Sequence, residues 1–281
     1  MSYQNIDGNN ITTKFIKDLS YSEFVGFINQ WNVGPGAYVT INKWVNFSNI
    51  NSNSNILEIG CTTGFSSREI ATLTNCNGVG IDISKYAIKM ANYNKEQYAS
   101  DIKIKYINVD AYDFNPQVKF THIIVGASLK FFHDPNGIMN RCIKTFLNTN
   151  GYILASPFYV EKRIPDNLLK LGEKTFGIVP TNIGYKEIMS LYNKLEILYE
   201  DRDNRILQET EEELKHYCKS TVDRTADFYN IDMGSRLYKT IYDRLYEIKT
   251  VTNLLRPYQK YSVLVLRYRK SIYPNRYVEL F

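Results

Sequence analysis

The first residues whose types and spacing could do chemistry lie in the stretch NILEIGCTTGFSSREIA. An apolar run ends around Glu58, Gly60 and Gly64 follow, and a helix is expected next. A dinucleotide-binding turn needs the pattern GxGxxG, but Thr62 and Phe65 occupy the second and third glycine positions. A triphosphate-binding loop is excluded as well, because the two glycines are one residue too close and no lysine follows them. Neither a pyrophosphate nor a triphosphate ligand is indicated.

Two more acidic residues come at the ends of expected strands. Asp82 lies 24 residues after Glu58, near the end of GVGIDIS, and Asp110 follows the apolar segment of YINVDAYDF. An acidic side chain after the second strand of a nucleoside-binding sheet can accept hydrogen bonds from both ribose hydroxyls. Asp82 therefore predicts a ligand that contains a nucleoside.

The turn resembles motif I of the class I S-adenosylmethionine-dependent methyltransferases, an acidic residue followed by GxGxG. Thr62 stands in place of the middle glycine, a small-residue variant that the family tolerates. A turn without bulky side chains lets the methionine and ribose parts of the cofactor lie close to the backbone. The resemblance covers about residues 55–158. It implies S-adenosylmethionine as the cofactor and S-adenosylhomocysteine as its product.

The resemblance also implies roles for single residues. Asp82 would bind the ribose, Ile83 would pack on the adenine, and Asp110 would accept from the exocyclic amine of the adenine. Cys61 would contact the cofactor through its backbone, and Tyr38, after a Gly-Pro-Gly segment, would form a gate over it; that segment could equally be only a helix break. The complete implied cofactor-binding set is Glu58, Gly60, Cys61, Thr62, Gly64, Asp82, Ile83, Asp110, Ala111, Gly126 and Tyr38.

His133, in FFHDP just past the fourth expected strand, is the candidate catalytic residue. It could act as a general base or donate a hydrogen bond to the acceptor. The alternative is a loop histidine that caps the following helix. His122 is expected in the core and His216 on the surface, and the three histidines lack metal-ligand spacing, so no metal is predicted.

Three departures from related patterns are visible, and the last two narrow the acceptor. The segment Phe120-Thr121-His122 stands where many family members begin this strand with Phe-Asp. GASLKFFHDP replaces the (D/N)PPY signature of amino-methylating DNA enzymes, and no Pro-Cys nucleophile follows the strand. Methylation of DNA amino groups and of cytosine C5 is therefore disfavoured.

Short apolar runs alternate with helical patterns and must position these residues. Such strands are covered by helices on both faces of a parallel sheet, which predicts a doubly wound α/β fold. The resemblance implies a mostly parallel, seven-stranded, Rossmann-like methyltransferase sheet. Strands are expected at residues 56–59, 78–83, 102–109, 121–125, 151–158, 195–199 and 261–268, with a helix over 135–147.

Four segments are predicted along the chain. Residues 1–54 form an N-terminal helical gate, and 55–200 form the cofactor-binding core. Residues 201–258 form a helical insertion, placed over the substrate site because open α/β sheets bind ligands at the carboxyl ends of their strands. Residues 259–281 add the final strand and a tail.

The composition is that of an ordinary globular protein of 281 residues with a net charge of +5. No apolar run is long enough for a membrane span, the N-terminus does not look like a secretory signal, and the four cysteines show no CxxC spacing. A reducing cytoplasm is the expected location. Basic residues gather between 236 and 281, either as a solvated face or as a patch for an anionic partner such as RNA.

These observations favour a methyltransferase that acts on a small-molecule acceptor enclosed by the insertion, with nucleic acid and membrane as unlikely partners. Two alternatives stay open: an RNA methyltransferase that uses the basic C-terminal region, and a protein that binds S-adenosylmethionine without catalysis. The sequence predicts neither the acceptor atom nor the oligomeric state.

Overall fold

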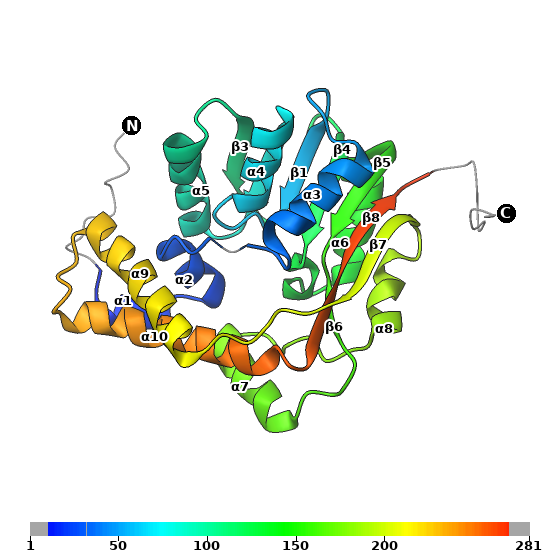
Figure 1. The fold of residues 1–281 in the computed structure, drawn as a ribbon. Coiled ribbons are helices and arrows are strands. Elements are labelled where there is room, and N and C mark those ends of the chain that lie inside the picture. Colours follow the sequence, from blue (N-terminus) through cyan, green and yellow to red (C-terminus); the bar gives the residue numbers. More distant parts are fainter. Residues whose placement is uncertain (1–10, 32, 270–281) are drawn as a thin grey trace.

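One mixed sheet with helices on both faces forms the centre of the molecule (Figure 1). The computed structural model describes residues 11–31 and 33–269. Its parallel part has the order β3-β2-β1-β4-β5, and β8 then pairs antiparallel with β5, β6 and β7. The strands are β1 (Asn55–Ile59), β2 (Asn77–Asp82), β3 (Lys103–Asn108), β4 (Phe120–Gly126), β5 (Leu147–Ala155), β6 (Phe158–Val160), β7 (Glu196–Asn204) and β8 (Gln259–Arg267). The predicted doubly wound fold is confirmed, with the short strand β6 as an addition.

The helices between the strands begin where local sequence signals place them. Helix α4 (Phe65–Thr74) follows Gly64, which has a left-handed φ of 77°. The Ser84 side chain caps α5 (Lys85–Tyr98) by accepting a hydrogen bond from the Ala87 amide, as its hydroxyl predicts. The expected helix over 135–147 is shorter: α6 (Pro135–Arg141) passes into a π-helical turn, and Leu147 already pairs with Phe120 at the start of β5.

Two apolar layers, one on each face of the sheet, hold these elements together. Leu57 and Ile59 of β1 point to the layer that includes α6, whereas Ile56 points to the layer with α3 and α4. All three side chains are fully buried, and truncation of such a residue to alanine costs about 2–5 kcal/mol. Burial on both faces explains why the strand is apolar at nearly every position.

The N-terminal segment contains α1 (Thr13–Asp18), α2 (Tyr21–Phe27) and α3 (Ala37–Ser48). The first two are separate helices, because Ser20 starts α2 with a capping box closed by Glu23. Helix α2 lies at the start of α5, where a Cβ on Gly26 would be only 2.4 Å from the Ala87 nitrogen. This close approach places α2 at the edge of the sheet where β2 ends.

Further helices cover that edge. The capping box of Thr210 and Glu213, a local signal in the sequence, starts α9 (Glu211–Tyr229), and α10 (Arg236–Leu255) follows. The structure adds α7 (Asp166–Phe176), which the sequence did not indicate. Helix α8 (Tyr185–Met189) lies within residues 184–192, which the sequence indicates as a helix. In Figure 1, α9 and α10 lie beside α1 and α2, and their buried residues share one apolar cluster. Across the described chain, none of the helices has the length and apolar character of a membrane span.

Hydrogen bonds tie the insertion to the N-terminal helices. The Thr225 hydroxyl of α9 donates to the Ile28 carbonyl at 3.1 Å. The Arg244 guanidinium of α10 donates to the carbonyls of Ile16 and Leu19. Helices α1 and α2 therefore form one layer with α9 and α10, although about 200 residues separate them in sequence. This layer is called the helical cover below.

Candidate functional site

The turn after β1 is compact and held by the neighbouring strand. The amides of Gly60 and Cys61 both donate to the Ile81 carbonyl, at 2.9 and 3.0 Å. Gly60, Thr62 and Gly64 have positive φ values of 70°, 49° and 77°. Thr62 adopts this left-handed backbone although it has a Cβ, which costs roughly 1–2 kcal/mol. The turn is therefore fixed by its neighbours, not by its own preferences.

Glu58 lies beneath this turn and is 6% exposed. Its Oε2 accepts a hydrogen bond from the Ser67 amide at 3.0 Å, which joins β1 to the first turn of α4. Loss of solvation on burial raises the pKa of Glu58 to about 7, against the opposing hydrogen bonds from Ser67 and Ser66. A cationic ligand close to such a buried carboxyl group stabilises its charged form.

Asp82 ends β2 and orients two loops. Its Oδ2 accepts from the Thr62 amide at 3.0 Å, and its Oδ1 accepts from the Ser84 amide at 2.8 Å. Burial raises its pKa above the ordinary value. The next side chain, Ile83, is 67% exposed, and Asn108 donates to the carbonyls of both Asp82 and Ile83. An exposed isoleucine on so firmly held a loop offers an apolar surface to a flat ring.

Asp110 and Ala111 follow β3 and are held in a similar way. The Oδ1 of Asp110 accepts from the Tyr112 amide at 2.9 Å. Arg141 of α6 donates to the Ala111 carbonyl at 3.1 Å, and Ala111 is buried. Because β1, β2 and β3 are parallel neighbours, the structure brings Glu58, Asp82 and Asp110 to one edge of the sheet.

Gly126 closes the site at the end of β4. Its φ is 47°, and a Cβ added there would meet nothing within 4 Å. Its carbonyl accepts from the Ser156 amide at 2.8 Å. The Ser128 hydroxyl donates to the carbonyls of Ile59 and Val125, which draws the loop after β4 toward the turn after β1. The space above Gly126 is therefore open, while its backbone is fixed.

Cys61 is buried, and burial raises the pKa of its thiol well above the usual range. A protonated, buried thiol is a poor nucleophile. The backbone contact of Cys61 with Ile81, described above, agrees with the small structural residue expected at this position.

The sequence did not reveal a set of contacts from the N-terminal segment to the turn. Asn94 of α5 donates to the Thr63 carbonyl at 3.2 Å and exchanges two hydrogen bonds with Asn29. The Thr63 hydroxyl donates to the Gln30 carbonyl at 3.0 Å. The Gln30 side-chain Oε1 is buried, and within the described chain no donor pairs with it. Gln30 therefore offers an unused acceptor beside the turn.

Tyr38 lies in the first turn of α3 and is 53% exposed. Its ring packs edge-on against Phe65, with centroids 5.4 Å apart, and Phe65 directly follows Gly64. The structure thus brings Tyr38 next to the start of α4. Its role as a gate stays a prediction.

His133 is exposed and packs against Tyr112, with ring centroids 4.6 Å apart. The cap of α6 is the neighbouring Asp134, whose side chain accepts from the Gly137 amide, so His133 does not cap this helix. His122 is a satisfied core histidine, with Nε2 3.0 Å from the Ser48 carbonyl, and burial lowers its pKa. In the described part of the chain, no three His, Cys, Asp or Glu side chains are grouped so that they could hold a metal.

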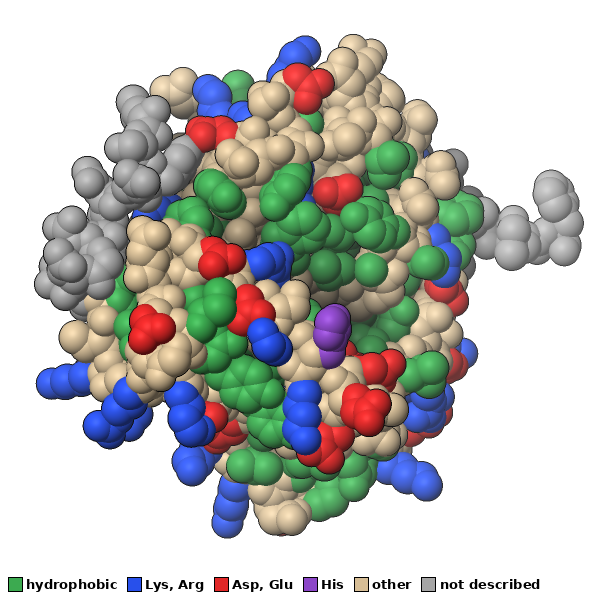
Figure 2. Space-filling model, turned by 60° about the vertical axis from the view of Figure 1, so that its left-hand side comes forward, with side chains coloured by type: hydrophobic (Ala, Val, Ile, Leu, Met, Phe, Trp, Pro, Cys, Tyr) green, Lys and Arg blue, Asp and Glu red, His purple; other side chains and the backbone are tan. Residues whose placement is uncertain are grey.

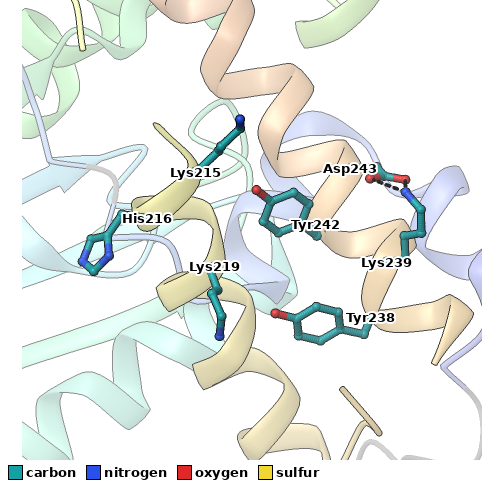
Figure 3. A pocket seen from close by; sticks show the side chains of 7 residues that line it. All are labelled: Lys215, His216, Lys219, Tyr238, Lys239, Tyr242 and Asp243. Carbon is teal, nitrogen blue, oxygen red and sulfur yellow. Dashed lines mark hydrogen bonds and ion pairs between the residues drawn. The ribbon is translucent and has the colours of Figure 1, made fainter. Parts of the chain in front are cut away.

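A groove of about 470 Å³ lies elsewhere, between α9 and α10 (Figure 3). Tyr238 and Tyr242 of α10 point toward α9 across it. Three lysines line it, but each pairs with an acidic residue one turn away on its own helix: Lys215 with Glu211, Lys219 with Asp223 and Lys239 with Asp243. The groove is far less suited to an anion than its lysines suggest, and none of the predicted site residues lines it.

The basic residues of the C-terminal region are also largely neutralised. Lys249 and Arg256 pair with Glu209, and Arg267 and Arg269 pair with Glu196. Lys270 and Arg276 lie outside the described residues. In Figure 2, basic and acidic side chains mix along the lower part of the face shown, while hydrophobic side chains gather around a hollow near its centre.

Comparison with known proteins agrees with this geometry. The family model described as "Methyltransferase domain" matches residues 50–219, more than half of the chain. Malonyl-[acyl-carrier protein] O-methyltransferase 2 of Ilyobacter polytropus is 29% identical over 184 residues, which cover 65% of this chain and 67% of that protein. Sterol 24-C-methyltransferase of Clavispora lusitaniae is 37% identical over 71 residues, 25% of this chain and only 19% of that protein.

Solved structures share the fold over most of the chain. The MccD protein has a TM-score of 0.65 and 26% identity, with 85% of this chain and 100% of that chain covered. A methyltransferase from Geobacter sulfurreducens in complex with S-adenosylhomocysteine has a TM-score of 0.66 at 14% identity, with 88% and 97% covered. Together with the family match and the turn after β1, these likenesses show that the chain belongs to the class I S-adenosylmethionine-dependent methyltransferases.

Proposed function

We propose that this protein transfers the methyl group of S-adenosylmethionine to a small-molecule acceptor held beneath its helical cover. The observation that carries the proposal is the convergence of Glu58, Asp82 and Asp110 at the ends of three neighbouring parallel strands, around a turn closed by Gly60 and Gly64. Open α/β sheets bind ligands at this edge.

The residues present fit the cofactor. Asp82 has lone pairs left for ribose hydroxyls after it accepts two backbone amides, and Ile83 offers exposed apolar surface to the adenine. The unused Oε1 of Gln30 can accept from the ammonium group of the methionine part. The buried Glu58 favours a positive charge nearby, because a cation would oppose the rise of its pKa.

When bound, S-adenosylmethionine would supply an activated methyl group for transfer to a lone pair of the acceptor, with a neutral thioether as the leaving group. The chain's own contribution is orientation, which can lower such a barrier by roughly 7–11 kcal/mol. A base is required only if the acceptor atom carries a proton at neutral pH, and His133 is the proposed base in that case.

The cover supplies the acceptor site in this proposal. The N-terminal helices with residues 201–258 enclose the acceptor, Tyr38 acts as a gate, and residues 55–200 hold the cofactor. The apolar cluster that joins α1, α2, α9 and α10 supports this division. A cytoplasmic location is supported by the four cysteines, which are all free and buried.

The pairing of the C-terminal cations disfavours RNA as the acceptor. Phosphate contacts need basic side chains free to exchange counterions, and four of these cations already bind carboxylates. The malonyl-[acyl-carrier protein] and sterol enzymes named above both act, by their names, on acceptors other than nucleic acid, which also supports the small-molecule proposal.

Two measurements test the proposal. Calorimetry should show that Asp82→Ala weakens S-adenosylmethionine binding by about 100-fold or more, the loss of two hydrogen bonds to a charged acceptor. Unchanged affinity would contradict the assigned site. Incubation of a metabolite extract with protein and methyl-labelled cofactor should then place label in a small molecule; cofactor binding without any labelled product would favour a non-catalytic binder.

A further inference from the structure

Lys130 lies just beyond the cofactor site, in a short 3-10 helix (Ser128–Phe131) that follows β4. Two residues earlier, Ser128 is bound to the turn after β1, so the position of this short helix is fixed relative to the cofactor site. The Lys130 Nζ lies 5.2 Å from the ring centroid of Phe131 and 5.7 Å from that of Phe158. Phe158 begins β6, three residues after the last residue of β5. The ammonium group thus lies next to the segments that follow the carboxyl ends of β4 and β5, the edge at which open α/β sheets bind ligands.

The charge of Lys130 is not matched by the protein. Its side chain is only partly exposed, yet no carboxylate or hydrogen-bond acceptor of the described chain pairs with its Nζ. Lys43 and Lys260, two other lysines of low exposure, do have such partners in Asp201 and Glu161. Burial lowers the pKa of Lys130 to about 8, so the cation is retained at neutral pH at some cost. Two aromatic faces compensate only part of the lost hydration.

The surroundings of Lys130 are otherwise apolar and aromatic. Phe131 stacks on Tyr21 of α2, with centroids 6.1 Å apart, and Tyr21 packs edge-on against Phe176 of α7. These rings come from α2, the loop after β4 and α7, so Lys130 lies where the loop after β4 meets the N-terminal segment and α7. A single cation in such a wall selects strongly for a ligand of opposite charge, because attraction is least screened where water is scarce.

We propose that Lys130 binds an anionic group, a carboxylate or a phosphate, on the methyl acceptor. This inference rests on the proposed function and names the acceptor's class: a small molecule with an aromatic or aliphatic body and an acidic group. Lys130 is a specificity-determining residue in this view. The ammonium group would donate to the anion while the rings hold the apolar body, and the acceptor atom would then face the cofactor over Gly126.

The test measures anion binding by protein saturated with S-adenosylhomocysteine, with acetate and inorganic phosphate as separate calorimetric probes. We expect Lys130→Met to weaken the preferred anion by about 10- to 100-fold, the usual worth of a hydrogen bond to a charged group, and Lys130→Arg to retain most of the affinity. The two probes separate a carboxylate site from a phosphate site. Lys89→Met is the matched control, because Lys89 is also a half-buried lysine over two aromatic rings, but it faces Phe228 and Tyr229 of α9.

Several results would overturn the inference. They are the absence of saturable binding of either anion to the wild type, equal binding by wild type and Lys130→Met, or an equal loss in Lys89→Met. If Lys130→Met instead weakens S-adenosylhomocysteine itself tenfold, the cation serves the cofactor and the acceptor assignment is wrong. A failure of the proposed function would look different, because the wild type would then not bind S-adenosylhomocysteine at all.

Discussion

Replacement of Glu58 by glutamine should stabilise the cofactor-free protein, although Glu58 lies at the centre of the site. The pKa of this buried carboxyl is raised from 4.5 to about 7, so the folded chain holds the proton more tightly than the unfolded chain. The charged form therefore costs stability as the pH rises from about 4.5 to 7. At roughly 1.4 kcal/mol per pH unit, the cost reaches about 3 kcal/mol above pH 8 and is under about 1 kcal/mol at pH 5.

Glutamine removes the charge but keeps a carbonyl that can accept from the Ser67 amide. Urea unfolding of wild type and Glu58→Gln without cofactor should show a gain of about 2–3 kcal/mol at pH 8.5 and little change at pH 5. Glu187→Gln on the surface of α8 is the control and should change neither value. Calorimetry should show weaker S-adenosylmethionine binding by Glu58→Gln at pH 8.5, because the negative charge is gone.

The reasoning fails if Glu58→Gln loses the same free energy at both pH values. That outcome would mean that Glu58 is charged in the folded protein at low pH and stabilised there by its hydrogen bonds. A gain in stability without any loss of cofactor affinity would mean that the carboxylate does not act on the ligand.

The remaining predictions concern the turn and the cover. Gly64→Ala should destabilise the protein by about 2–4 kcal/mol in urea unfolding, because its Cβ would lie 2.6 Å from the Tyr106 ring and its φ is left-handed; a loss under 1 kcal/mol would contradict the geometry. Asn94→Ala should cost about 1–3 kcal/mol and also weaken cofactor binding, because the Thr63 carbonyl loses its donor; retained affinity would show that the turn holds without it. Arg244→Leu should speed limited proteolysis between α1 and α2 by about tenfold or more, because two carbonyls there lose a charged donor, while the melting of the sheet should change little.

The sequence was sufficient for the turn after β1, for the place of Asp82 at the end of β2 and for the succession of strands along the chain, because these depend on local spacing and on apolar runs. The same holds for the capping box that starts α9, since a hydroxyl and a carboxyl three residues apart are a local signal. Local signals also misplaced some boundaries. The helix expected over 135–147 ends in a π-helical turn, because Leu147 pairs with Phe120 of β4 and so belongs to β5.

Long-range contacts were beyond the reach of the sequence. Nothing near Asn94 indicates that it binds Thr63 and Asn29, and Gln30 carries no motif. The basic C-terminal residues looked available until the structure paired them with acidic residues such as Glu196 and Glu209 from distant segments. For Lys130 the difference runs the other way. It lacks an acidic partner among the described residues, and nothing in the sequence of this loop indicates that.

The position of β8 has a consequence for how the chain folds during synthesis. This last strand lies between β5 and β7, so the sheet cannot be completed until residues 259–267 have left the ribosome. The N-terminal helices are also completed late, because Ile28 and its partner Thr225 are 197 residues apart. Synthesis of that stretch takes about 10–40 s at usual rates of translation. Until then, β5 presents an open edge and α2 an uncovered apolar face. The nascent chain therefore exposes these surfaces until residues 259–267 emerge, and slower translation between β5 and β8 should increase aggregation while leaving the folded protein unchanged.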